Sequence, residues 1–417
     1  MDESTADTTR TGTATGGWRL TKWRALGLVS VAELLAMSLW FSATAVAPEI
    51  AAAWGLTPGE TGLLTSAVQV GFVVGALLSA ALTLSDAVPP RYLFAASTAA
   101  GAAATAVLAV AVEALLAAVL LRFLTGVALA GAYPPGMKIA AGWFDDARGL
   151  AIGTVVGALT VGSALPHLLR AVGGVGRPRV VLLGAAGLAL VGGGLVLLVR
   201  PGPYQAPAAP FDPAAVRRVL SDRGTALANL GYFGHMWELY AVWTWLPAYL
   251  LAATAVGSDG LASLLTFATI AVGGLGAVAA GLSADRLGRT TVTSAAMVVS
   301  GSASLLAWAV LGAPLLVLTP FLLVWGVTIV ADSAQFSAAV TELADPSYVG
   351  TALTFQTAVG FLLTTVSIQL VPVLRGTFGL GWGEAFATLA LGPALGTLAM
   401  RRLAASPDAA KLAGGRG

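Results

Sequence analysis

The sequence contains twelve stretches of mostly apolar residues, each close to the length of about 20 residues that a helix needs to cross a bilayer. Charged residues make up only 10% of the chain, against about a quarter in soluble domains. So few charges cannot cover the surface of a soluble protein, which excludes an ordinary soluble enzyme or a nucleic-acid-binding protein. The sequence therefore predicts an all-α membrane protein that spans the bilayer at 25–47, 60–84, 92–112, 114–141, 147–171, 179–199, 225–252, 260–284, 290–312, 314–342, 347–374 and 382–400.

Lysine and arginine fall unevenly on the two sides of these spans. If both termini are cytoplasmic, sixteen of the 22 basic residues lie on that side and only four, Arg170 among them, lie on the other. The remaining two, Arg122 and Lys138, lie within the fourth span. Cytoplasmic loops of membrane proteins carry such an excess. We therefore expect a multi-pass protein of the cell membrane with both termini in the cytoplasm.

The two halves of the chain match each other at three places. Residues 33–40 (ELLAMSLW) match 238–245 (ELYAVWTW) with a shift of 205 residues, and shorter matches pair 125–127 with 325–327 and 148–151 with 349–352. The direction is the same in each case, which predicts parallel repeats related by an axis along the membrane normal. We expect a polar cytoplasmic segment at 1–24, six-helix bundles at 25–199 and 225–402, a cytoplasmic linker at 200–224 and a cytoplasmic tail at 403–417.

The loop between spans eight and nine carries a specific motif. Its residues Gly281, Asp285, Arg286, Gly288 and Arg289 follow the spacing G-x-x-x-D-R-x-G-R, which resembles the loop signature of the major facilitator superfamily. This resemblance implies two pseudo-symmetric six-helix bundles around a central cavity, and a loop that latches the bundles in one conformation. The counterpart in the first half, at residues 85–91, is degraded, so its role stays open.

Ionisable residues within the spans are concentrated on particular helices. The resemblance implies that spans one, four, seven and ten line the cavity and that spans three, six, nine and twelve face lipid. Six of the seven ionisable residues lie on the first set of spans, and such residues usually face a cavity. We therefore expect these six to converge on one water-accessible cavity, and His167 of span five to lie at the membrane interface. The seven residues are Glu33, Arg122, Lys138, His167, His235, Glu238 and Asp332.

Four of these residues are candidates for proton coupling: Glu33, Glu238, Asp332 and Arg122. For each glutamate the alternative is a structural pair, for Arg122 it is a fixed salt bridge that aligns helices, and Lys138 can instead extend to the headgroups. The consecutive prolines after Tyr133 should break span four. Residues expected to line the substrate cavity are Trp40, Gln69, Tyr133, Lys138, His235, Trp245, Gln335 and Gln356.

The function indicated by these features is secondary active transport of a small solute by alternating access, coupled to protons. A glutamate on span one with an arginine on span four is similar to proton-coupled multidrug exporters of the superfamily. One alternative is a nitrate, nitrite or cyanate porter, although nitrate porters use arginines in spans two and eight that are missing here. Another alternative is a membrane transceptor that only binds its ligand.

Other classes of function lack their sequence motifs. The chain has no cysteine, no P-loop, and neither H-E-x-x-H nor G-x-S-x-G, so we expect no enzyme activity, no metal and no cofactor. The expected partners are a small-molecule substrate, protons and the lipid bilayer, without nucleic acid, and we expect a monomer. Substrate identity and the direction of transport stay open.

Overall fold

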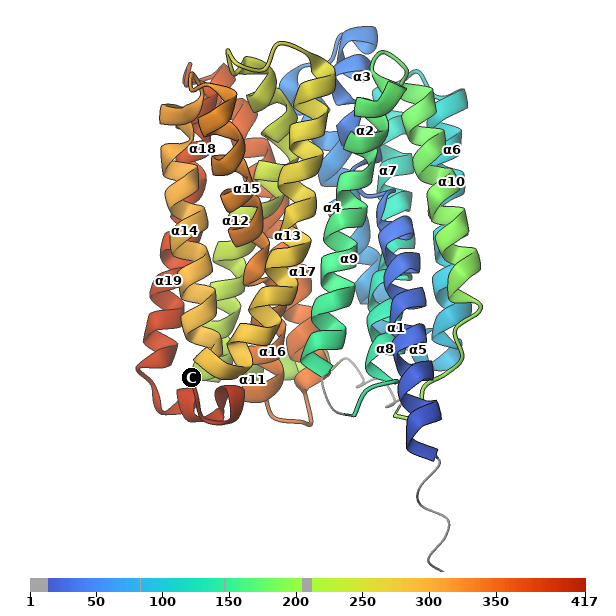
Figure 1. Ribbon diagram of the computed structural model, residues 1–417, viewed down its shortest axis with the longest axis vertical. Helices are drawn as coiled ribbons and strands as arrows, with labels where there is room; N and C mark the ends of the chain where they lie inside the picture. Colours follow the sequence, from blue (N-terminus) through green and yellow to red (C-terminus); the bar gives the residue numbers. More distant parts are fainter. Residues whose placement is uncertain (1–13, 83, 146–147, 205–211) are drawn as a thin grey trace, which may run out of the picture.

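A computed structural model describes residues 14–82, 84–145, 148–204 and 212–417, and within these ranges the regular secondary structure is helical. Most of the expected segment 1–24 and the middle of the linker 200–224 lie outside the described residues. The long helices run between two faces of the molecule (Figure 1). We call the face where α1 begins and α19 ends the terminal side, and the other face the distal side.

The first six-helix bundle contains the predicted spans one to six. Its elements are α1 (Ala14–Met37), α2 (Ser42–Ala45), α3 (Ala47–Trp54), α4 (Pro58–Ala81), α5 (Leu84–Ala87), α6 (Pro90–Ala111), α7 (Leu115–Ala130), α8 (Tyr133–Ala141), α9 (Arg148–Leu169), η1 (Arg170–Gly174) and α10 (Pro178–Val196).

The second bundle contains spans seven to twelve and follows the short linker elements η2 (Pro213–Ala215) and α11 (Val216–Ser221). Its elements are α12 (Arg223–Ala252), α13 (Asp259–Leu287), α14 (Arg289–Val310), α15 (Leu315–Ala331), α16 (Ser333–Leu343), α17 (Val349–Gly376), α18 (Trp382–Ala387), η3 (Thr388–Ala390), α19 (Leu391–Ala404) and η4 (Pro407–Gly414).

Twelve transmembrane helices are therefore present, and several of them are broken. In the described chain, nine continuous helical spans are long and apolar enough to cross a membrane, judged by length and composition alone. The other three are α1, which carries three charges (Lys22, Arg24 and Glu33) over its last eighteen residues, α12, which is rich in Trp and Tyr, and the last span, which is divided among α18, η3 and α19. The charges of α1 and the polar aromatic residues of α12 suit inner helices, whereas the last span falls short because no single helix in it is long enough.

The two bundles repeat the same helix crossing. A Cβ added at Gly71 would collide with the Phe123 carbonyl where α4 crosses α7, and one added at Gly276 would collide with the Val327 carbonyl where α13 crosses α15. Small residues let membrane helices approach this closely. The crossing in the second bundle lies about 205 residues after that in the first, so the internal repeat of the sequence is also a repeat of packing.

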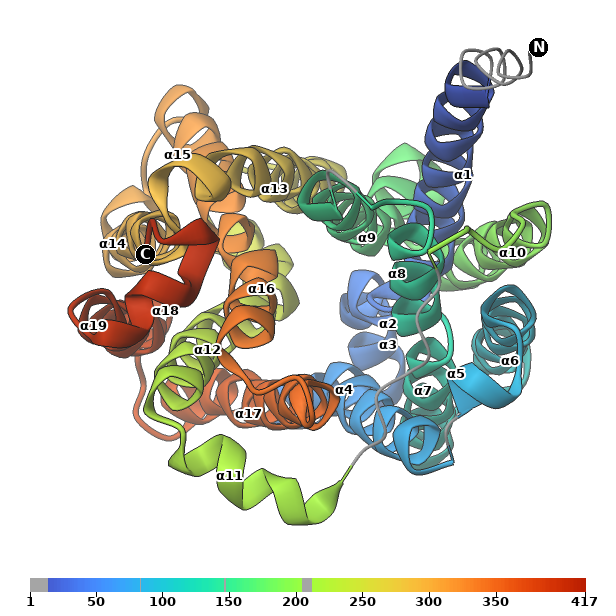
Figure 2. The same ribbon diagram turned by 90° about the horizontal axis from the view of Figure 1, so that it is seen from below.

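Figure 2 shows how the bundles meet. α9 lies beside α13 and α4 lies beside α17, and these two pairs join the bundles. α6, α10, α14 and α19 lie on the outside. These four are spans three, six, nine and twelve, the helices expected to face lipid.

Candidate functional site

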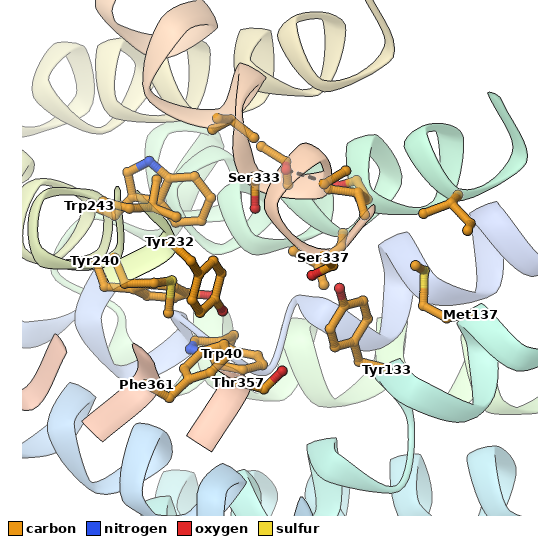
Figure 3. Close-up of a pocket in the computed structure, with 18 residues that line it drawn as sticks. Trp40, Tyr133, Met137, Tyr232, Tyr240, Trp243, Ser333, Ser337, Thr357 and Phe361 are labelled. Carbon is orange, nitrogen blue, oxygen red and sulfur yellow. Dashed lines mark hydrogen bonds between the residues drawn. The ribbon is translucent and has the colours of Figure 1, made fainter. Parts of the chain in front are cut away.

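A central cavity lies between the two bundles, with a volume of about 90 Å³. Spans one, four, seven and ten line it, as expected, and spans five and eleven contribute as well. The polar and aromatic side chains on its wall include Trp40, Tyr133, Thr160, Tyr232, Tyr240, Trp243, Ser333, Ser337, Thr357 and Phe361. In Figure 3 most of the aromatic rings gather at one end, and Tyr133, Met137 and Ser337 lie at the other.

Aromatic rings from both bundles contact each other on the cavity wall. The Trp40 ring of the first bundle lies 5.5 Å from the Phe361 ring and 5.9 Å from the Tyr240 ring, between ring centroids. Phe72, beside the cavity on α4, lies 4.7 Å from Phe361. Rings at such separations attract each other beyond the area they bury. This aromatic cluster therefore connects the bundles across the middle of the molecule.

Among the described residues, those that line the cavity include no Asp, Glu, His, Lys or Arg. The expectation that the intramembrane charges converge there is therefore wrong, although the helices that carry them are the correct ones. Trp40 and Tyr133 line the cavity as expected. Gln69, His235, Trp245, Gln335, Gln356 and the four proton-coupling candidates do not line it.

Glu33 is buried in the first bundle, on a face of α1 that turns away from the cavity. Its carboxylate packs against Gly136 of α8, where an added Cβ would collide with Oε2, and the Phe94 ring lies beside the same Gly136 site. Neither carboxylate oxygen has a hydrogen-bond partner among the described residues. The structural pair considered for Glu33 is therefore not formed in this conformation.

A break in the first span explains why Glu33 and Trp40 point in different directions. α1 ends at Met37. The backbone N–H of Trp40 donates to the Met37 carbonyl, a bond from residue i to i−3. The tighter turn interrupts the helical period of 3.6 residues, so Glu33 and Trp40 do not share one helix face. Trp40 enters the cavity and Glu33 stays behind it.

Arg122 supports this break. Its guanidinium donates to the carbonyls of Leu39 (3.0 Å) and Trp40, and to Ser42 Oγ (3.1 Å). Its Nε donates to the Leu64 carbonyl at 3.4 Å. The Leu39 and Trp40 carbonyls lie at the break after α1, where a helix end leaves carbonyls without the usual intrahelical donors. The expected salt bridge is absent among the described residues, and Arg122 holds backbone in place of a carboxylate.

Glu238 is buried in the second bundle and has partners. Ser304 Oγ of α14 donates to its Oε1 at 2.5 Å, and Trp325 Nε1 of α15 donates to the same oxygen at 3.4 Å. Glu33 and Glu238 are thus in equivalent bundle positions, each behind the cavity and between helices of its own half. They do not share a cavity in this conformation.

Asp332 and His235 form a second buried pair beside the cavity. Asp332 lies at the break between α15 and α16, which repeats the break between α7 and α8 that the two prolines predicted. Its Oδ1 is 2.9 Å from His235 Nδ1. Ser333, next to Asp332 in the chain, and Tyr232, one helical turn before His235, line the cavity, so the pair lies just behind the cavity wall.

The other expected cavity residues have different neighbours. Gln356 Oε1 accepts from Ser337 at 3.2 Å and Gln335 Oε1 accepts from Arg289 at 2.8 Å. Trp245 Nε1 donates to the Ile368 carbonyl, and its ring faces a groove on the distal side. Gln69 is buried in α4, and its amide has no partner among the described residues.

A vestibule of about 380 Å³ adjoins the cavity on the terminal side, between α4, α8, α16 and α17. Tyr133, Met137, Ser337 and Thr357 line both spaces. Lys138 lines the vestibule only. Lys138 therefore lies at the entrance to the cavity and not at its centre.

The distal side is closed by a group of charges centred on Arg170, which sequence reasoning used only for topology. Arg170 is 1% exposed and lies 2.9 Å from Glu49 of its own bundle and 2.8 Å from Asp259 of the other bundle. It also donates to Ser263 Oγ at 2.7 Å. We call Arg170, Glu49, Asp259 and Ser263 the distal ion-pair cluster. It joins η1 to the beginning of α13, and so it joins the bundles.

The loop motif lies at the terminal side of α13 and α14. Arg289 pairs with Glu342 of α16 at 2.6 Å and more weakly with Asp285 at 3.5 Å. Asp285 also lies at the start of α9 in the first bundle, since a Cβ added at Gly149 would be 3.5 Å from its Oδ2. The latch role of the loop stays a prediction. Arg286 is exposed, Gly288 has a φ of 92°, and a Cβ at Gly281 would lie 3.6 Å from the Gly149 carbonyl.

Sequence reasoning missed most of the cavity wall on α12. Tyr232, Met236, Tyr240 and Trp243 line the cavity, and their spacing of three to four residues is that of one helix face. This stripe was visible in the sequence, on a face different from that of Glu238. The charged residues were given more weight than the aromatic ones.

Comparison with known proteins agrees with this architecture. A family model described as Major Facilitator Superfamily matches residues 29–368. Among solved structures, a mutant form of the nucleoside transporter NupG has a TM-score of 0.70 at 15% identity, covering 91% of this chain and 99% of that one. A bacterial homologue of the human lysosomal transporter Spinster, inward-facing and unoccupied, has a TM-score of 0.68 at 14% identity, covering 93% and 99%. No curated protein matches the sequence significantly. With more than half of its length matched by the family model, the chain belongs to the major facilitator superfamily of membrane transporters.

Proposed function

We propose that this protein is a proton-coupled secondary transporter of a small organic solute that works by alternating access. The observation that carries the proposal is the one-sided closure of the central cavity. The distal ion-pair cluster joins the bundles on one side, while the vestibule adjoins the cavity on the other. Rocking the bundles about the aromatic cluster would break the first contact and close the second space.

The orientation proposed from the basic residues places the vestibule on the cytoplasmic side of the cell membrane. In that case the structure corresponds to an inward-facing conformation, as does the structure of the Spinster homologue of the same fold. Substrate would enter or leave the cytoplasm past Tyr133, Met137, Ser337 and Thr357.

We propose Glu33 as the main residue for proton coupling. Its carboxylate is fully buried with no partner among the described residues, and an unpaired charge is costly to bury. Glu33 packs against α8, the helix that begins at Tyr133 on the cavity wall. A movement of α8 that wets Glu33 would let it release its proton, so protonation and conformation would depend on each other. Glu238 and the His235–Asp332 pair are the corresponding candidates in the second bundle.

Reconstitution in liposomes tests this proposal. An imposed pH gradient should drive solute uptake, and Glu33→Gln should abolish the dependence on the gradient while exchange of solute across the membrane continues. Glu113→Gln is the matched control, since Glu113 lies in an exposed turn between α6 and α7. Full gradient-driven uptake in both Glu33→Gln and Glu238→Gln would contradict the coupling. Binding without any flux would favour the transceptor alternative.

The small-anion alternative receives less support from the cavity. Nitrate, nitrite and cyanate need compensating positive charge, and the only basic residue beside the substrate path in the described chain is Lys138, in the vestibule. Arg122 donates to three backbone carbonyls and a serine. It therefore has no free face for an anion in this conformation.

A further inference from the structure

The composition of the central cavity indicates which solutes it accepts. An ion that entered the cavity would lose its water shell and find no opposite charge on the wall. Transfer of an unpaired charge into such surroundings is strongly unfavourable. The wall instead offers hydroxyl groups from Tyr133, Ser333 and Thr357. These groups suit a neutral solute that forms hydrogen bonds.

The aromatic rings of the cavity favour a flat apolar body. Trp40, Tyr240 and Phe361 form a continuous cluster with centroid separations of 5.3–5.9 Å, and all three line the cavity. A planar ring inserted beside them gains contact area and ring-to-ring attraction. An aliphatic solute of the same size would gain only the contact area.

Two tryptophans that line the cavity each carry a hydrogen-bond donor without an acceptor. The indole N–H groups of Trp40 and Trp243 are buried, at 1% and 2% residue exposure, and neither has a partner among the described residues. Buried donors are nearly always paired in proteins, and leaving one unpaired is costly. Trp40 belongs to the first bundle and Trp243 to the second, so a ligand that accepts from both would connect the bundles.

We propose, building on the transport function above, that the substrate is a neutral solute with a planar aromatic body and hydrogen-bond acceptors that meet the Trp40 and Trp243 N–H groups. Carbonyl oxygens and unprotonated ring nitrogens are acceptors of this kind. The cavity volume of about 90 Å³ is far below the roughly 300–1,000 Å³ of drug-sized sites. A body of about one ring therefore fits without movement of the helices, and larger solutes require the adjoining vestibule.

A set of four probes of similar size tests this class on the purified full-length protein. Benzamide is neutral, aromatic and carries a carbonyl; benzoate and benzamidine add a negative or a positive charge; cyclohexanecarboxamide keeps the amide without the aromatic ring. We expect benzamide to bind at least tenfold more tightly than either ion, and several-fold more tightly than cyclohexanecarboxamide. Equal binding of all four probes, no binding of any, or preference for an ion would overturn the assignment.

Variants separate the N–H groups from the rings. Trp40→Phe and Trp243→Phe keep an aromatic ring and remove the donor, which should weaken benzamide binding about three- to tenfold each. Trp308→Phe is the control, because Trp308 is 61% exposed on the outer helix α14. Unchanged affinity in both cavity variants would refute the role of the donors.

A variant that changes which probe binds best, and does not merely weaken binding, separates a binding effect from a loss of folding. Ser333→Asp places a carboxylate on the cavity wall and should shift the preference from benzamide to benzamidine; an unchanged preference would count against the cavity as the binding site. These outcomes are distinct from failure of the transport proposal. Benzamide binding without flux would overturn transport and keep the substrate class, whereas flux of an ion would overturn the substrate class and keep transport.

Discussion

The distal ion-pair cluster leads to a quantitative prediction about the balance between conformations. The double variant Asp259→Ala/Ser263→Ala removes the side-chain partners that Arg170 has in the second bundle and keeps Glu49, its partner in the first. Because Arg170 stays paired with Glu49, the variant leaves no unpaired buried charge. Its effect should therefore fall on the contact between the bundles and not on the folding of either.

The magnitude follows from the exposure of each partner. Asp259 is 46% exposed, so its ion pair contributes only about 0.5–1 kcal/mol. The bond to the buried Ser263, 2.7 Å long, has a charged donor and contributes about 1.5 kcal/mol or more. Together they stabilise the closed distal side by about 2 kcal/mol. Since 1.4 kcal/mol is a factor of ten, the ratio of open to closed molecules should rise about 30-fold.

Spin labels can measure this ratio directly, because the chain contains no cysteine that must first be removed. Val175→Cys and Thr254→Cys place one label on each bundle at exposed distal positions. In the double variant the distribution of label distances should gain a longer component. Ala53→Cys with Val175→Cys is the control pair, since both positions lie in the first bundle. The reasoning is refuted if the cross-bundle distances stay unchanged, or if the control pair shifts equally.

Three further predictions concern stability. Gly126→Ala should lower the melting temperature clearly, because its Cβ would collide with the Val68 carbonyl and overpacking costs about 1–3 kcal/mol; Gly187→Ala, where nothing lies within 4 Å, should not. Arg122→Met should destabilise by about 3 kcal/mol or more by thermal unfolding, since several bonds from a charged donor are lost; equal stability would refute its support of the helix break. Ser304→Ala should destabilise the wild type more than the Glu238→Gln variant, and purely additive effects would contradict their bond.

Most of the fold could be predicted from the sequence because bilayer thickness dictates helix length. All twelve spans are present, and the outer position of α6, α10, α14 and α19 agrees with the absence of ionisable residues from the middle of those spans. The break before α8 was also predictable, since two prolines remove helical hydrogen bonds there. Length, charge and proline each act locally, so their effects can be read without coordinates.

The breaks after Met37 and after Ala331 could not be predicted in the same way. No proline or glycine marks the first, and it is held from a distance by Arg122, 82 residues away from Trp40 in the chain. A helical period continued across such a break assigns side chains to the wrong face. This error placed Glu33 and Trp40 together, and only the tertiary contact corrects it.

The intramembrane charges misled the prediction of the cavity for a more general reason. Their high cost in hydrocarbon excludes them from lipid-facing surfaces, so they mark helices that are surrounded by protein. A charged side chain can avoid lipid by facing a water-filled cavity, and it can avoid lipid equally well in the packed interior of one bundle. Glu33 lies against Gly136, and Glu238 lies against Ser304 and Trp325. Charge therefore identified the inner helices, whereas the aromatic stripe of Tyr232, Tyr240 and Trp243, which needs no exclusion from lipid, marks the face of α12 that a substrate would meet.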